Sequence, residues 1–157
     1  MKSVAMLISG LAILLSCNKD EGLEINEQDF LIFGHFYGEC IGEGCVEIFK
    51  LTDKGVFEDT VDDYSGENLE FVPLESGLFD EVRDLQDYFP VQLLSERKEV
   101  FGCPDCADGG GLHIQYSNYG IVSRWRIDQM KDNVPTYLHD FMDKVNEKIA
   151  LIHERTE

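Results

Sequence analysis

Basic residues are scarce in this sequence. Only 13 lysines and arginines stand against 31 aspartates and glutamates, which gives a formal net charge of -18 over 157 residues. Such an excess of carboxylates repels phosphate backbones and anionic lipid headgroups. The composition therefore argues against nucleic acid as a partner. With 43% hydrophobic residues, the chain is nevertheless apolar enough to fold as one globular domain.

Sequence motifs of common enzyme and cofactor sites are also missing. The chain holds no glycine-rich phosphate loop, no His-Glu-x-x-His, no Gly-x-Ser-x-Gly and no EF-hand pattern. Its four histidines are dispersed, and we expect each to be a surface residue or a hydrogen-bonded core residue. They are His35, His113, His139 and His153. The sequence therefore predicts no catalytic residue and no cofactor, and it favours a non-enzymatic role.

Two acidic groups could hold a cation. One is Asp105 with Asp108, which precede a run of glycines, and the other is a cluster in the segment between residues 59 and 67. Neither reproduces the alternating ligands of a calcium loop, so we expect solvated loops and predict no metal site. The second cluster consists of Asp59, Asp62, Asp63 and Glu67.

The chain has no apolar run long enough to span a bilayer. Its longest one, Val4–Leu15, covers 12 residues and follows the positively charged start Met1-Lys2-Ser3. A membrane helix needs about 20 apolar residues, whereas the hydrophobic region of a signal peptide has about 7–15. Residues 1–16 are therefore predicted to be an export signal that is removed.

The predicted cleavage site is Leu14-Leu15-Ser16-Cys17. It resembles the lipobox of bacterial lipoproteins, which implies that Cys17 carries the lipid and begins the mature protein. The next residues, Asn18-Lys19-Asp20-Glu21, resemble the surface-export signal of Bacteroidota lipoproteins. The resemblance implies a lipid-anchored outer-membrane protein that faces the cell surface, with the periplasmic face as the alternative. Residues 17–28 would form an acidic tether.

The cysteine count agrees with this assignment. Five cysteines are present, and using Cys17 for lipid leaves two close pairs, Cys40 with Cys45 and Cys103 with Cys106. In an exported protein, structural disulfides are favoured, within the pairs or between them. A four-cysteine metal site or a thiol-redox role of the Cys-x-x-Cys pair remain alternatives.

Residues 29–157 are predicted to form a single α+β domain. Two hairpins are expected, one from Val46–Leu51 and Val56–Thr60, the other from Leu112–Tyr116 and Ile121–Ile127. They should form an antiparallel sheet packed by two helices. The first helix is capped by Ser76 and ends before Pro90, and the last is capped by Asn133. Their apolar stripes are Leu78, Val82, Leu85 and Phe89, and Leu138, Phe141, Met142, Val145, Ile149 and Ile152.

The two halves share an order of elements: strand, cysteine pair flanked by glycines, strand, turn with glycine, strand and helix. This order suggests an internal duplication that would bring both cysteine loops near one another. Common turn chemistry would produce the same likeness without shared ancestry. Trp125, between Arg124 and Arg126, could stack on a sugar or fill the core, and its place inside a strand favours the core.

The leading hypothesis is a lipid-anchored binding or interaction module with a disulfide-braced α+β domain. It would contact the membrane through its N-terminal lipid only and bind an unknown protein or extracellular ligand. The alternative is a thiol-redox or metal-binding function of Cys40, Cys45, Cys103 and Cys106.

Overall fold

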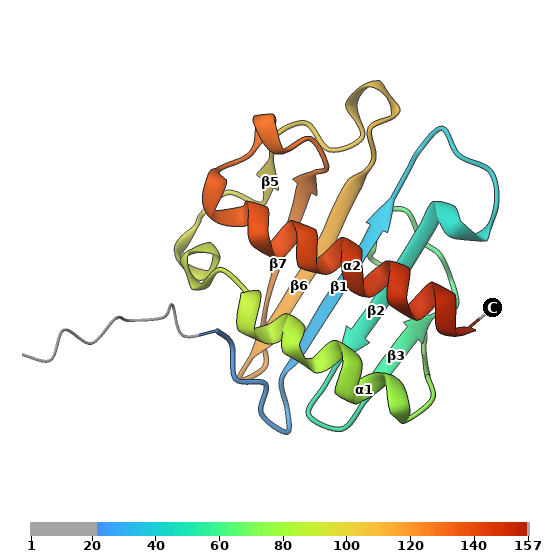
Figure 1. Ribbon diagram of the computed structural model, residues 1–157. Helices are drawn as coiled ribbons and strands as arrows, with labels where there is room; N and C mark the ends of the chain where they lie inside the picture. The colour runs from blue at the N-terminus through green and yellow to red at the C-terminus, as the bar shows by residue number, and fades with distance from the viewer. Residues whose placement is uncertain (1–21, 157) are drawn as a thin grey trace, which may run out of the picture.

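The computed structural model describes residues 22–156, which form one mixed sheet covered on one face by helices (Figure 1). The predicted signal residues 1–16 and the lipid-carrying Cys17 lie outside the described residues. The strands are β1 (Phe30–Phe36), β2 (Val46–Leu51), β3 (Val56–Asp59), β4 (Phe71–Pro73), β5 (Val100–Phe101), β6 (Gly111–Asn118) and β7 (Ile121–Asp128). The α-helices are α1 (Gly77–Val82) and α2 (His139–Thr156). Short 3-10 helices are η1 (Glu43–Cys45), η2 (Arg83–Tyr88), η3 (Val91–Ser95), η4 (Cys106–Asp108), η5 (Lys131–Asn133) and η6 (Thr136–Leu138).

The strand order across the sheet is β4-β3-β2-β1-β6-β7-β5. All neighbours pair antiparallel except β5, whose two residues pair in parallel with Arg126 and Ile127 of β7. Both predicted hairpins are present, as the β2–β3 and β6–β7 pairs. The α+β class is confirmed. The sequence predicted a wholly antiparallel sheet, but the sheet is mixed. The exception is β5, which follows the helical segment and runs parallel to β7 at the edge of the sheet.

This pairing bears on the duplication hypothesis, which makes β1 and β5 equivalent strands. β1 lies between β2 and β6 in the centre of the sheet, whereas β5 lies at the edge and contacts β7 only. The two halves therefore share an order of elements along the chain but differ in how their first strands pair.

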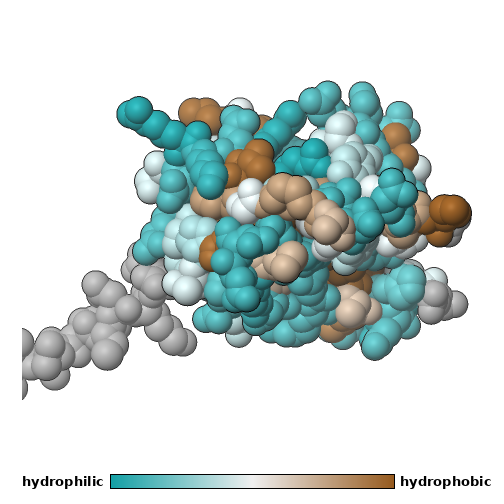
Figure 2. Space-filling model, turned by 90° about the horizontal axis from the view of Figure 1, so that it is seen from above, coloured by the Kyte–Doolittle hydropathy of each residue, from teal (hydrophilic) through white to brown (hydrophobic). Residues whose placement is uncertain are grey.

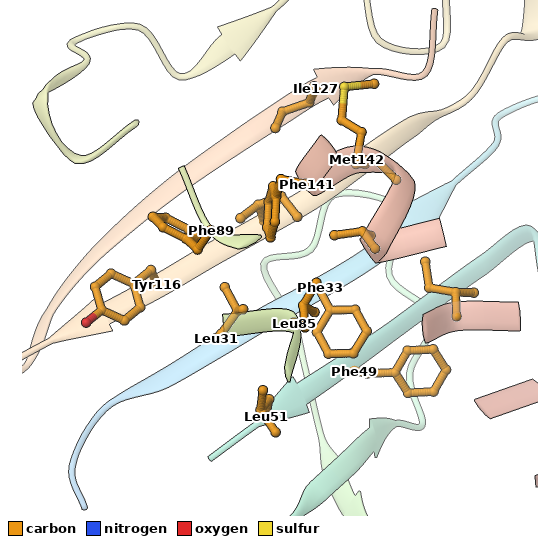
Figure 3. Packing of buried hydrophobic residues seen from close by; sticks show 14 of the residues in the cluster. Leu31, Phe33, Phe49, Leu51, Leu85, Phe89, Tyr116, Ile127, Phe141 and Met142 are labelled. Atoms are coloured by element: carbon orange, nitrogen blue, oxygen red, sulfur yellow. The ribbon is translucent and has the colours of Figure 1, made fainter. Parts of the chain in front are cut away.

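The main core lies between the sheet and the helices (Figure 3). Side chains of alternate strand residues point to opposite faces of a sheet, and Leu31 and Phe33 of β1 meet Phe49 and Leu51 of β2 on the helical face. Phe141 packs edge-on against Phe89, with 5.4 Å between ring centroids. The predicted stripe of the last helix is fully buried here, and so is that of the first helical segment.

The ends of the helical segments differ from the predictions. Ser76 has helical dihedrals and makes no capping hydrogen bond, and the segment tightens into η2 after Val82. Asn133 lies in η5, and its side chain amide donates to Asp128 instead of capping α2. At the N-terminus, Leu23 and Ile25 are buried in the core although they fall within the predicted tether 17–28.

Both cysteine loops lie at one end of the sheet, at the top of Figure 1. They follow β1 and β5 and are joined by a hydrogen bond from the Gly38 amide to the Asp105 carboxylate, 2.9 Å long. Seen from this end, the surface is mainly hydrophilic, with separate hydrophobic spots rather than one continuous patch (Figure 2). The two loops are near one another, which the duplication hypothesis would require.

Candidate functional site

The face of the sheet away from the helices carries the candidate site. Here the loop between β3 and β4 rests on β6 through Gly66, which lies against His113 and accepts a hydrogen bond from Gln115. Three polar residues of this strand are buried. Beside this loop, β6, β7 and β5 form the floor and wall of a hollow of about 270 Å³. The buried polar residues are His113, Gln115 and Ser117. The hollow is lined by Ser65, Gly66, Glu67, Glu99, Val100, His113, Arg124, Trp125 and Arg126.

His113 is 4% exposed and lines the hollow from β6. The Gln115 side chain amide donates to the Gly66 carbonyl oxygen and lies 2.7 Å from His113 Nε2. The amide nitrogen of glutamine can only donate a hydrogen bond, so Nε2 of His113 is the acceptor. The proton of the neutral imidazole is therefore on Nδ1. Burial lowers the pKa of His113 to about 4, assisted by the charges of Arg126 and Arg124. At neutral pH the ring is an uncharged N–H donor.

Arg126 lies opposite His113 on β7. Its backbone N–H donates to the Glu99 carbonyl oxygen on the β5 side, so His113 and Arg126 form a non-hydrogen-bonded pair, in which side chains approach most closely. The guanidinium stacks 4.0 Å from the centroid of the Phe36 ring and 5.0 Å from that of Tyr64. Such cation–π contacts hold the side chain in place.

Two buried nitrogens of this pair have no hydrogen-bond partner. They are His113 Nδ1 and Arg126 Nε. Buried donors are nearly always paired, because an unmade hydrogen bond in the interior leaves the loss of hydration uncompensated by about 1–3 kcal/mol. Two such donors on facing side chains of one hollow therefore point to an acceptor group of a ligand.

The charges around the hollow are separated by depth. Arg126 is half-buried and His113 is buried, whereas Glu67, Glu99 and Arg124 are exposed at the rim. Neither arginine makes an ion pair with any side chain in the described part of the chain. In contrast, the lysines of α2 and Arg155 pair with acids of the helical layer, including Asp84, Glu75 and Glu81.

Gly66 determines how the loop fits over the site. Its φ is +68°, and a Cβ at this position would lie 2.1 Å from Cε1 of His113. Only glycine therefore allows the loop to rest on the imidazole. Asp63 holds the loop shape: its carboxylate accepts from the hydroxyl and amide of Ser65 and from Asn68, and these hydrogen bonds hold its pKa well below the usual range.

Asp105 connects this loop to both cysteine loops. One carboxylate oxygen accepts from the Tyr64 hydroxyl, at 2.8 Å, and from the Gly38 amide, and the other accepts from the Gly110 amide. The hydrogen bond from Tyr64 is the main reason that the pKa of Asp105 is lowered. The residue predicted as a possible cation ligand thus acts as a hydrogen-bond acceptor for three segments.

The four remaining cysteines form two local disulfides, Cys40–Cys45 and Cys103–Cys106. The structural interpretation of the cysteine pairs is thereby supported, and a site of four thiolates is not formed. Within residues 22–156, no group of three or more histidine, cysteine, aspartate or glutamate side chains is arranged to hold a metal ion. Asp59 is 4% exposed and accepts hydrogen bonds from the amides of Asp62 and Glu70.

The other histidines have hydrogen-bonding roles at the surface. His35 and His153 flank Glu47, at 3.5 Å and 3.1 Å from its carboxylate oxygens. His139 lies 3.0 Å from the Lys131 carbonyl oxygen. Trp125 is 3% exposed and part of the main core, as its position in a strand predicted.

No sequence motif marks the donor pair as a site. The strand pattern contained one signal: in the run Arg124-Trp125-Arg126, burial of the tryptophan on one face requires both arginines on the other. The position of His113 opposite Arg126 depends on strand register, and its burial depends on a distant loop. Neither is encoded by a local motif.

Comparison with known protein families finds no family model that matches this chain. Comparison with curated proteins also finds no match. In the described part of the chain, no helix has both the length and the hydrophobicity that crossing a bilayer requires.

Proposed function

We propose that this protein is a lipid-anchored, non-enzymatic binding module whose ligand site is the hollow on the open face of the sheet. The observation that carries the proposal is the pair of buried donors without partners, His113 Nδ1 and Arg126 Nε. Both side chains line the same hollow. A hydrogen-bond acceptor of a small ligand would satisfy both.

The chemistry of the lining favours binding over catalysis. A general base works best with a pKa near the working pH, whereas the pKa of His113 is about 4 and its Nε2 is engaged by Gln115. The hydroxyl among the lining residues, that of Ser65, donates to Asp63. Fixed donors on two neighbouring strands form a preorganised recognition surface rather than a nucleophile with its base.

Ligand entry would require the loop at Gly66 to move. The two donors are shielded from solvent, and the loop rests directly on the imidazole. Its contacts to the rest of the domain include the 3.1 Å hydrogen bond from Gln115 to Gly66, the Tyr64–Asp105 hydrogen bond and the packing of Tyr64 on Phe36 and Arg126. These contacts would break when the loop lifts, in a local opening of the kind that binding loops undergo.

The anchor part of the proposal rests on the sequence Leu14-Leu15-Ser16-Cys17 and on the charged residues that follow it. Cys17 would carry the lipid and hold the domain at the outer membrane, facing the cell surface. In the expressing bacterium, radioactive palmitate should label the wild-type protein and not a Cys17→Ala variant. Protease added to intact cells should degrade the wild-type domain, and full protection would instead indicate the periplasmic face.

Thermal-shift screening of the mature protein, purified from membranes in detergent, tests the binding site. Small molecules that bind should raise the melting temperature of the wild type and have little effect on Arg126→Gln. Because Arg126 also packs on Phe36, the exposed Arg124→Gln variant serves as a second test, with Arg83→Gln in the helical layer as the control. Hits that stabilise all variants equally would place binding elsewhere and contradict the proposal.

A further inference from the structure

The separation of charges within the hollow indicates which class of small molecule it recognises. Its deep part offers the uncharged N–H of His113 and the positive guanidinium of Arg126. Its rim carries the carboxylates of Glu67 and Glu99 together with Arg124, all exposed. A ligand that matches this pattern carries negative charge at the end that enters first and positive charge at the end that stays near the rim.

The charge of the whole protein argues in the same direction. At a formal charge of -18, the protein repels free anions over the range of the ionic atmosphere. A molecule whose charges cancel does not experience this repulsion, yet its carboxylate can still be bound locally by Arg126. The two arginines and the two glutamates of the lining also cancel, so a ligand of zero net charge leaves the site neutral.

We propose that the hollow binds a small zwitterionic amino carboxylate, of the size of a free amino acid. The carboxylate accepts hydrogen bonds from His113 Nδ1 and Arg126 Nε and is attracted by Arg124. The ammonium group lies between the carboxylates of Glu67 and Glu99. This inference rests on the proposed function, because it assigns a ligand class to that same site.

The size of the hollow agrees with this class. Its volume of about 270 Å³ equals that of roughly nine water molecules at about 30 Å³ each. It lies just below the range of about 300–1,000 Å³ that drug-sized ligands occupy. Val100 contributes apolar lining, against which a hydrocarbon side chain can pack.

Solution NMR of the full-length mature protein in detergent micelles tests the proposal, with the His113 imidazole and Gly66 backbone amide signals as reporters. Four pools are compared: the proteinogenic L-amino acids, their deaminated carboxylic acids, their decarboxylated amines, and neutral hexoses. The amino acid pool should shift both reporters at concentrations at least tenfold lower than the other three pools.

Variants then separate the contributions of the two charges. Glu67→Gln combined with Glu99→Gln should remove the tenfold preference for amino acids over the deaminated acids. Arg124→Gln should weaken binding of both pools about tenfold, and Arg124→Lys should recover most of the loss. Lys98→Gln, outside the lining, is the matched control and should leave binding unchanged.

The outcomes distinguish failure of this inference from failure of the proposed function. If hexoses or deaminated acids shift the reporters as strongly as amino acids do, the site binds a different class and the zwitterion proposal is overturned. If none of the four pools shifts the reporters, the hollow takes up no small-molecule acceptor, and the binding site itself is overturned as well. An unchanged preference in the double glutamate variant would also contradict the ammonium position.

Discussion

At the residue scale, the side chain of Asp105 holds three segments together by hydrogen bonds. It lies in the Cys103–Cys106 ring with φ of +63°, a conformation that aspartate and asparagine adopt more readily than most residues. Its carboxylate receives the amide of Gly38, the hydroxyl of Tyr64 and the amide of Gly110. The loop that covers the candidate site is thereby linked to both cysteine loops.

Replacement of Asp105 by asparagine should reduce the free energy of unfolding by about 1–2 kcal/mol near pH 6, because the amide nitrogen cannot accept a hydrogen bond. The pKa of Asp105 is lowered in the folded state, so its contribution is present above the unfolded pKa of about 3.9 and is lost as the pH falls below it. Urea unfolding should therefore show a difference that narrows towards pH 3. Asp108→Asn, also at positive φ, is the control, and an equal effect there would contradict a special role of Asp105.

His113 should make stability depend on pH in a different window. Its pKa is about 4 in the folded protein and about 6.5 when unfolded. As the pH falls through 6.5, the unfolded state takes up a proton that the folded state does not bind. Stability should decline by up to about 3 kcal/mol between pH 6.5 and 4 and then level off.

Urea unfolding curves of the wild type and His113→Gln over this pH range test that prediction. The neutral variant should lose the part of the decline that His113 causes. In NMR spectra, the imidazole signals of His113 should stay at their neutral positions between pH 7 and 5.5. A titration midpoint near 6.5 would show that the ring is not shielded as the structure describes.

At the scale of elements, Lys148 joins the two helical segments. Its side chain is 5% exposed, and Nζ lies 2.7 Å from Oδ1 of Asp84 in η2. The same ammonium donates to the carbonyl oxygen of Glu81 at the end of α1. α1 has only 6 residues and is too short to be stable alone, so this contact and the apolar stripe keep it on the sheet.

Lys148→Met should reduce stability by about 2 kcal/mol, because it leaves the Glu81 carbonyl oxygen without its donor and Asp84 without its closest cation. Lys131→Met is the matched control: Lys131 pairs with Asp143, but both side chains are largely exposed, so the loss should stay below about 1 kcal/mol. Chemical denaturation measures both. Equal effects would mean that Lys148 does not position α1.

At the scale of the whole molecule, the two disulfides stabilise loops and do not crosslink the core. Each closes a short ring, because its two cysteines are only 5 or 3 positions apart in the sequence. On the chain-entropy model, such a ring contributes roughly 2 kcal/mol. The core instead spans the sheet from Val56 of β3 to Phe101 of β5 and includes both helices, so the fold does not depend on the crosslinks.

Peptide mapping of non-reduced protein should find Cys40 linked to Cys45 and Cys103 linked to Cys106. Replacing both cysteines of one pair by serine should lower stability by roughly 2 kcal/mol and leave the circular dichroism spectrum of the folded protein unchanged. Four free thiols with stoichiometric zinc would instead establish the metal alternative, and links between the two pairs would contradict the local disulfides.

Much of the architecture was predictable, because the spacing of apolar residues along the chain indicates the helices and strands. The stripe from Leu138 to Ile152 repeats with the period of a helix, so its burial follows from amphipathicity. The turns at Gly55 and Gly120 each separate two short apolar segments, and both hairpins formed there. The parallel pairing of β5 was not predictable, because two residues carry no pattern and their partner is chosen by the path of the preceding helices.

The candidate site depends on contacts that local sequence does not specify. The acidic composition, the helices and the hairpins follow from residue types and short-range spacing alone. In contrast, the position of His113 opposite Arg126, the contact of Gly66 with the imidazole and the lack of partners for the two donors all arise from the folded arrangement. The physical reason is that strand register and loop packing bring together residues that are far apart in the chain. Burial at this place removes water from the imidazole N–H of His113 and leaves it without an acceptor.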